Sequence, residues 1–117
     1  MPAIRSVAKR TALKAARHMK KKGATRAQRE DLLHEYGNMA SGNFKGFRKI
    51  WGNIGSIQRL SMGPDQLRVL RETRAALAEN KRVDELDKIL QLGELDARIV
   101  YLNSLLEKDM AKYPRNR

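Results

Sequence analysis

The sequence predicts an all-α protein of four to five helices, and three observations favour this fold class. Apolar residues recur at intervals of three and four over long stretches, no stretch alternates apolar and polar residues as a strand does, and glycine or asparagine separates the periodic segments. The 117 residues suffice for one compact core. With six aromatic residues, that core is expected to consist mainly of Leu, Ile, Val, Met and Ala.

Residues 3–22 are expected to form the first helix, because the segment has five alanines and no glycine or internal proline. Cations cover most of this helix, and small apolar or neutral residues form the remaining stripe. The stripe consists of Ile4, Val7, Ala8, Thr11, Ala15 and Met19. Gly23 is suited to end the helix, and the three lysines before it favour the negative end of the helix dipole.

A second helix is predicted to begin at Thr25, where Thr25 and Gln28 match a capping box, and to end at about residue 36. Its expected apolar face is Ala27, Leu32, Leu33 and Tyr36, with Met39 and Ala40 as an extension. Residues 37–63 contain six of the eight glycines, which weaken a helix by roughly 1 kcal/mol each relative to alanine. A helical period through Phe47, Ile50, Trp51, Ile54 and Ile57 nevertheless predicts a helix over about 43–60.

Two helices are predicted in the remaining chain. Pro64 marks a helix start, and residues 64–79 carry Leu67, Leu70 and Leu77 on one side. A turn at Asn80-Lys81 leads to a last helix over 82–112, with a kink at Gly93 and Pro114 beyond its end. Its expected core stripe is Leu86, Ile89, Leu90, Leu95, Ile99, Leu102, Leu106 and Met110. The expected organisation is a basic helical arm (1–24), a helical segment with a glycine-rich aromatic and basic centre (25–63), and an antiparallel hairpin scaffold (64–117).

The charge distribution points to a polyanionic partner. The net charge is +12, and residues 1–30 hold ten basic residues and one acid, a net charge of +9. Residues 61–117 carry eleven bases and ten acids, which is an ordinary mixed surface. A solvated face normally mixes signs because like charges repel, so the N-terminal segment is interpreted as a nucleic-acid-binding arm. Its candidate contacts are Arg5, Lys9, Arg10, Lys14, Arg17, Lys20, Lys21, Lys22, Arg26 and Arg29.

A second candidate is the segment 43–51, in which Lys45, Arg48 and Lys49 alternate with aromatic residues. Single-strand binders combine cations with rings on which bases stack, and Phe44 and Trp51 are the candidate rings. Helical spacing favours the other interpretation, in which Trp51 belongs to the core and Phe44 is the most exposed ring. A helix-turn-helix over 26–36 and 43–57 is a further alternative, although its link is longer than usual.

Enzymatic chemistry finds little support in the sequence. There is no P-loop, dinucleotide fingerprint or nucleophile elbow, and no cysteine. Glu30 and His34 share a helical face without a third metal ligand, so neither a metal nor a cofactor is expected. The N-terminus lacks the apolar centre of a secretory signal, although its amphipathic, acid-free character also resembles a mitochondrial presequence.

The sequence therefore predicts a non-enzymatic protein that binds nucleic acid by its backbone, with little sequence specificity, within a larger nucleoprotein assembly. DNA and RNA, single- and double-stranded, all stay open as ligands. The alternative is a structural subunit of a virion or other particle, whose arm packs on a genome or an acidic neighbour. Other protein subunits are expected partners, transmembrane insertion is not expected, and the expected location is the cytoplasm or the inside of a virus particle.

Overall fold

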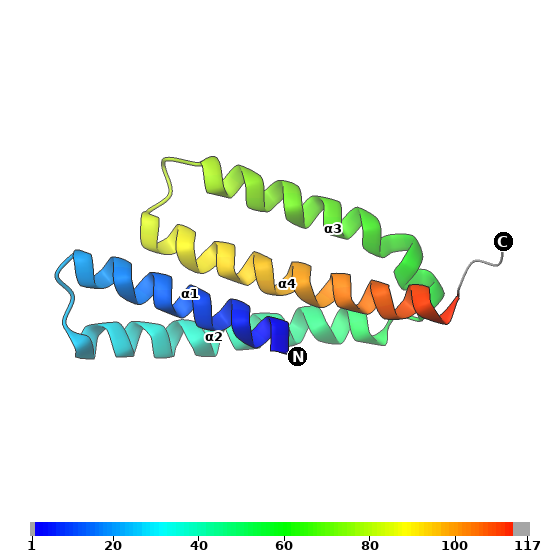
Figure 1. The fold of residues 1–117 in the computed structure, drawn as a ribbon, viewed down its shortest axis with the longest axis horizontal. Coiled ribbons are helices and arrows are strands. Elements are labelled where there is room, and N and C mark those ends of the chain that lie inside the picture. Colours follow the sequence, from blue (N-terminus) through cyan, green and yellow to red (C-terminus); the bar gives the residue numbers. More distant parts are fainter. Residues whose placement is uncertain (1, 114–117) are drawn as a thin grey trace.

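The computed structural model describes residues 2–113, but not the side chains of residues 2–5 and 39. The described residues form four helices. They are α1 (Pro2–Lys21), α2 (Arg26–Asn53), α3 (Ser56–Glu79) and α4 (Glu85–Lys112), and the described residues contain no strand. The molecule is elongated, about 59 Å by 26 Å by 22 Å. The α1–α2 and α3–α4 turns lie at one end, and the α2–α3 turn lies at the other (Figure 1). The prediction of an all-α fold is confirmed.

The turn between α1 and α2 is built as the local sequence predicts. Gly23 has a φ of 86°, a conformation that costs glycine little. The Gly23 and Ala24 amides donate to the carbonyls of Lys20 and Met19 at 3.1 Å and 3.0 Å, which closes the end of α1 as a Schellman motif. Thr25 then forms a complete capping box with Gln28 at the start of α2.

Helix α2 corrects the prediction of two shorter helices, because it continues without interruption from Arg26 to Asn53. The glycines at 37, 42 and 46 are exposed, and none has another group within 4 Å of where a Cβ would lie. They lower helix propensity but leave the inward face intact, and the packing of that face on α4 outweighs their cost. Residues 43–53 are helical as predicted, but they belong to α2, and the predicted helix over 43–60 is wrong in its bounds. The helix-turn-helix is wrong, since no turn separates 36 from 43.

The true break lies at Ile54-Gly55, and α3 starts at Ser56, eight residues before the predicted start at Pro64. Pro64 lies inside α3, and the first turns of the helix run at an angle to the rest (Figure 1). Gly63 is buried, and a Cβ there would lie 2.6 Å from Leu106 Cδ2 of α4. The first turns of α3 therefore pack closely on α4, in a contact that local sequence does not reveal.

Helix α4 starts at Glu85 and not at residue 82, because the Asp84 side chain accepts from the amides of Leu86 and Asp87. The predicted turn after Glu79 is confirmed, and α4 continues as helix through Gly93 to Lys112. The expected stop at Pro114 lies outside the described residues.

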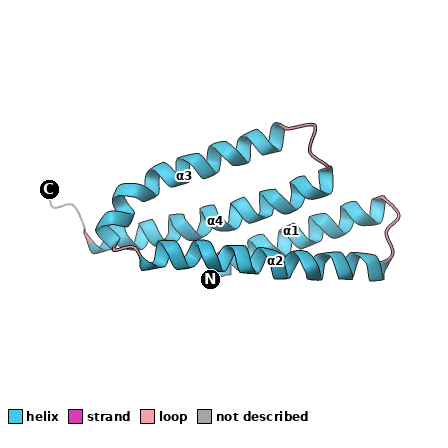
Figure 2. Ribbon diagram, turned by 180° about the vertical axis from the view of Figure 1, so that it is seen from behind, coloured by secondary structure: helices cyan, strands magenta, loops and turns pink. Residues whose placement is uncertain are grey.

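Helix α4 is the central element, with α1, α2 and α3 packed around it (Figure 2). The main core joins Trp51 of α2, Leu67 and Leu70 of α3, and Leu102 and Leu106 of α4. Burial of these side chains supplies most of the driving force for folding, at about 25 cal/mol for each Å² of apolar surface. Several residues assigned to core stripes are instead exposed, which corrects the prediction: Ala27 of α2, and the larger side chains of Ile50 (63%), Ile57 (70%) and Met110 (62%).

Helix α1 packs along α4 with one narrow face. Val7, Thr11, Ala15 and Met19 are buried, whereas Ala8 of the predicted stripe is exposed. The helices approach so closely that a Cβ at Gly93 of α4 would lie 2.8 Å from Thr11 Cβ. The basic N-terminal segment is therefore mounted on the bundle and does not project from it.

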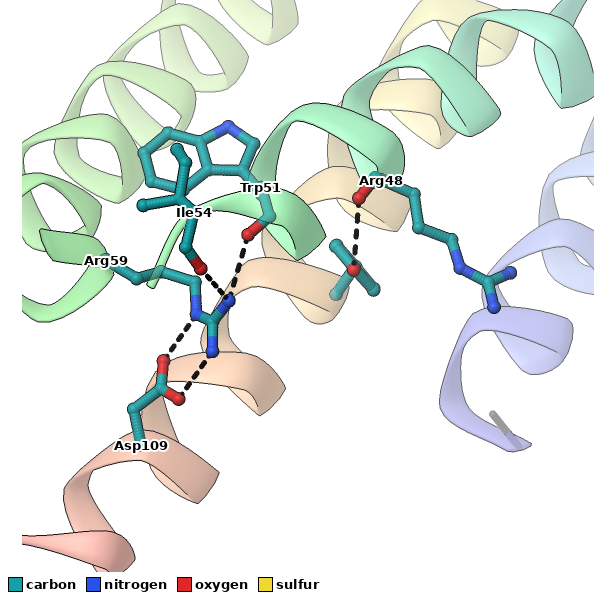
Figure 3. A network of polar contacts seen from close by, with 6 residues as sticks. Arg48, Trp51, Ile54, Arg59 and Asp109 are labelled. Atoms are coloured by element: carbon teal, nitrogen blue, oxygen red, sulfur yellow. Dashed lines mark hydrogen bonds and ion pairs between the residues drawn. The ribbon is translucent and has the colours of Figure 1, made fainter. Parts of the chain in front are cut away.

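A buried ion pair joins three helices at the end of the bundle where the α2–α3 turn lies (Figure 3). Arg59 of α3 donates from Nε and Nη2 to both carboxylate oxygens of Asp109 in α4, at 2.5 Å and 2.7 Å. Its Nη1 donates to the carbonyls of Trp51 and Ile54, at the end of α2. These hydrogen bonds hold the pKa of Asp109 below its usual range, so the pair stays charged.

Candidate nucleic-acid interface

Four cations of α1 share one flank of the helix. Arg10, Lys14, Arg17 and Lys21 follow one another at intervals of four, three and four residues, which places them within an arc of about 60° at 100° per residue. All four are exposed. At 1.5 Å per residue they extend over about 16 Å, so they form a straight row. We refer to these four residues as the basic stripe.

The basic stripe borders a groove between α1, α3 and α4. Lys14, Arg17 and Lys21 line this groove of about 390 Å³, and Arg10 continues the same flank toward the start of α1. His18, half-buried, lines it from α1 as well. Thr11, Ile89, Leu92 and Gly93 line it too, so Lys14, Arg17 and Lys21 border a hollow between the helices.

The other walls carry both signs of charge. Arg74 of α3 pairs with Asp96 of α4, and its Nη2 lies 3.3 Å from Asp96 Oδ2. The hydrogen bond from Arg74 thus neutralises one acid of the groove, and Glu85 is the second acid that lines it. Among the described side chains, no stripe cation lies within 4.0 Å of a carboxylate. Their charge is therefore available to an anionic ligand.

The remaining predicted contacts of the N-terminal segment are spread over other surfaces. Lys9, Lys20 and Lys22 are exposed outside the groove. Arg26 pairs with Glu30 on the exposed side of α2, at 3.0 Å. Arg29 is half-buried, and its Nη1 donates to the Ala24 carbonyl at 2.8 Å, so it supports the α1–α2 turn. The Arg5 side chain lies outside the described residues.

The two candidate stacking rings of the central segment are covered to different degrees. Trp51 is 7% exposed and belongs to the core, as the favoured interpretation had it. Phe44, expected to be the most exposed ring, is half-buried and packs edge-on against Tyr101, with centroids 5.5 Å apart. Lys45, Arg48 and Lys49 are exposed on α2, and none of them lines the groove of the basic stripe.

Sequence reasoning missed two features that shape the groove: His18 and the Arg74–Asp96 pair. His18 could have been found, because it follows Lys14 by four residues and so lies on the same side of α1. Arg74 and Asp96 lie 22 residues apart on different helices, and nothing in their local sequence links them.

The described residues offer neither a metal site nor a membrane span. No group of three His, Cys, Asp or Glu side chains in residues 2–113 is placed to hold a metal ion. No helix of this part of the chain is long and apolar enough to cross a bilayer. Comparison with protein-family models, curated proteins and solved structures finds no match to this chain, so its function is inferred from its own residues and geometry.

Proposed function

We propose that the protein binds nucleic acid through the phosphate backbone, with the basic stripe of α1 as its principal contact. The supporting observation is the alignment of four exposed cations without acid partners among the described residues, three of which line one wall of a groove. A row about 16 Å long matches roughly five phosphates along one strand of a duplex, at 3.4 Å per phosphate. Each phosphate contact releases counterions, which is the usual source of non-specific affinity.

Binding of this kind carries little sequence information, because phosphate contacts position a protein and base contacts specify it. The groove offers the stripe cations and His18 but no row of Asn and Gln side chains suited to base edges. The proposed protein is non-enzymatic and acts by coating or neutralising nucleic acid within a larger assembly.

The test replaces the stripe and compares it with a matched variant. The stripe variant is Arg10→Gln, Lys14→Gln, Arg17→Gln and Lys21→Gln. The matched variant is Arg71→Gln, Lys81→Gln, Arg82→Gln and Lys108→Gln, which also removes two arginines and two lysines, all exposed. Both variants therefore have the same net charge.

If the stripe binds phosphate, fluorescence anisotropy at about 0.1 M salt shows affinity for a labelled oligonucleotide weakened on the order of 100- to 1,000-fold in the stripe variant. The matched variant should lose far less affinity, because it keeps the four stripe cations that contact the phosphates. Equal losses in the two variants would show that only net charge matters, and would refute the stripe as the contact.

A further inference from the structure

A second groove lies on the opposite face of α4. It is lined by α2, α3 and α4 and measures about 640 Å³, and we refer to it as the acidic groove. The average direction of the six α4 residues that line it lies about 170° around the helix from that of the five α4 residues that line the groove beside the basic stripe, which we call the basic groove. The second half of α3 separates the two grooves.

The lining of the acidic groove is apolar with acids beside it. Leu32, Leu77, Leu90 and Leu95 supply apolar surface from three helices, and of these only Leu90 is buried. Exposed acids from two helices, Glu35 and Asp87, and the half-buried Glu94 also line it.

Two other polar groups of the acidic groove are already engaged. The Tyr36 hydroxyl donates to the Leu90 carbonyl at 2.8 Å. Arg98, the one cation that lines the groove, has its guanidinium 5.7 Å from the Phe47 ring centroid. An occupant must therefore offer an apolar side chain surrounded by cations.

The outer face of α1 has this composition. Leu13 is 49% exposed, and three of its four neighbours at i±3 and i±4 are cations: Lys9, Arg10 and Arg17. A leucine amid exposed bases complements a leucine-lined groove beside exposed acids, both in hydrophobicity and in charge. We call Lys9, Leu13 and Lys20, with the neighbouring Arg10 and Arg17, the Leu13 face.

We infer that the acidic groove of one molecule binds the Leu13 face of a second copy. The two surfaces differ, so the contact is heterologous and adds copies head to tail. The net charge of +12 opposes association, but salt at physiological strength screens it beyond about 8 Å, whereas the groove acids meet the face directly. The inference does not depend on nucleic acid, and its test contains none.

Analytical ultracentrifugation of the full chain tests this contact through two defective variants. Leu13→Asp weakens binding by the Leu13 face, because its carboxylate would be repelled by the acids of the groove. Glu35→Lys with Asp87→Lys spoils the groove and leaves the face intact. The control is Val69→Asp on α3, which makes a similar change at a residue 47% exposed and outside the groove lining.

The wild type and Val69→Asp should form oligomers that grow with concentration and shrink with salt. Each defective variant alone should associate at least about 30-fold more weakly, as expected for loss of an interface anchor. A mixture of the two should form a one-to-one dimer that grows no further, since one intact face meets one intact groove. A monomeric wild type, association of Leu13→Asp equal to that of the wild type, or no dimer in the mixture would each overturn the inference.

Discussion

The buried pair of Arg59 and Asp109 joins α2, α3 and α4 at the end of the bundle where the α2–α3 turn lies. Asp109 is 1% exposed and Arg59 is 8% exposed, so both charges have left water. Desolvation of two ions is costly, and the attraction between them offsets it only when every polar atom finds a partner. Here Arg59 also donates to two carbonyls at the end of α2, where backbone acceptors lack partners within the helix. The pair therefore fixes the positions of α2, α3 and α4 together.

Asp109→Asn tests this role at a single residue. It leaves the buried Arg59 charge without its counterion, so we expect the free energy of unfolding to fall by about 3–5 kcal/mol. Urea unfolding followed by circular dichroism measures the change. Glu107→Gln on the same helix is the control, because Glu107 is exposed and its loss should cost about 0.5 kcal/mol or less. Equal effects of the two changes would contradict a structural role for the pair.

Tyr36 gives the fold a dependence on alkaline pH. Burial, with a smaller effect of Glu94, raises the pKa of Tyr36 to about 12. In the unfolded chain the phenol ionises near 10, so between about 10 and about 12 the unfolded state gains stability relative to the folded one. The advantage of the wild type over Tyr36→Phe at pH 8 should therefore shrink across this range in urea unfolding. An advantage that stays constant up to pH 12 would contradict the burial of the phenol.

At the scale of the element, the closest recorded approach of α1 to a glycine of α4 is that of Thr11 to Gly93. Gly93→Ala would bring a Cβ against Thr11, so the helices must move apart, and overpacking of this kind costs about 1–3 kcal/mol. Gly46→Ala is the matched control, since Gly46 lies in α2 with nothing within 4 Å of the added Cβ. There the higher helix propensity of alanine should stabilise the protein by up to about 1 kcal/mol.

Thermal unfolding should therefore shift in opposite directions for the two glycine variants. Addition of Thr11→Ala to Gly93→Ala should restore part of the loss, because it removes the threonine hydroxyl and methyl groups that the new Cβ meets. Stabilisation by Gly93→Ala alone would show that α1 does not pack on α4 in this register.

Sequence was sufficient for elements whose ends are set locally. The capping box at Thr25 and the glycine turn at Gly23 involve groups within a few residues of each other, so both were predicted correctly. The position of the α2–α3 break was not predicted correctly. The glycines of residues 37–46 and Pro64 suggested helix ends at places where tertiary packing keeps the chain helical. Contacts 43 and 50 residues apart, Gly63 with Leu106 and Arg59 with Asp109, determine that segment.

The candidate interface, too, could be predicted from the sequence only in part. The row of stripe cations follows from helical spacing alone, since 100° per residue fixes their common flank. The groove beside them does not, because α3 contributes Arg74 and α4 contributes its acids only once the chain has folded. The exposure of Phe44 was predicted incorrectly for the same reason, because Tyr101, which packs against its ring, is 57 residues away in the sequence.

At the scale of the whole molecule, charge is segregated across the central helix. The basic groove carries the stripe on one face of α4, and the acidic groove carries Glu35, Asp87 and Glu94 on the other. In copies stacked as inferred above, Arg10 and Arg17 of the stripe would lie in the contact, whereas Lys14 and Lys21 lie outside the Leu13 face and would still line the basic groove. The proposed phosphate binding and the inferred stacking would therefore compete for these two arginines.

The salt dependence of nucleic-acid affinity tests the central claim most directly. Anisotropy titrations of duplex DNA at several salt concentrations give the slope of log K against log salt, which is about −0.9 for each phosphate contact. If all four stripe cations contact phosphates, the stripe variant should have a slope less negative than that of the wild type by about 3.6, while the matched variant stays close to the wild type. A wild-type slope near zero, or a slope that the stripe variant leaves unchanged, would contradict backbone binding by α1.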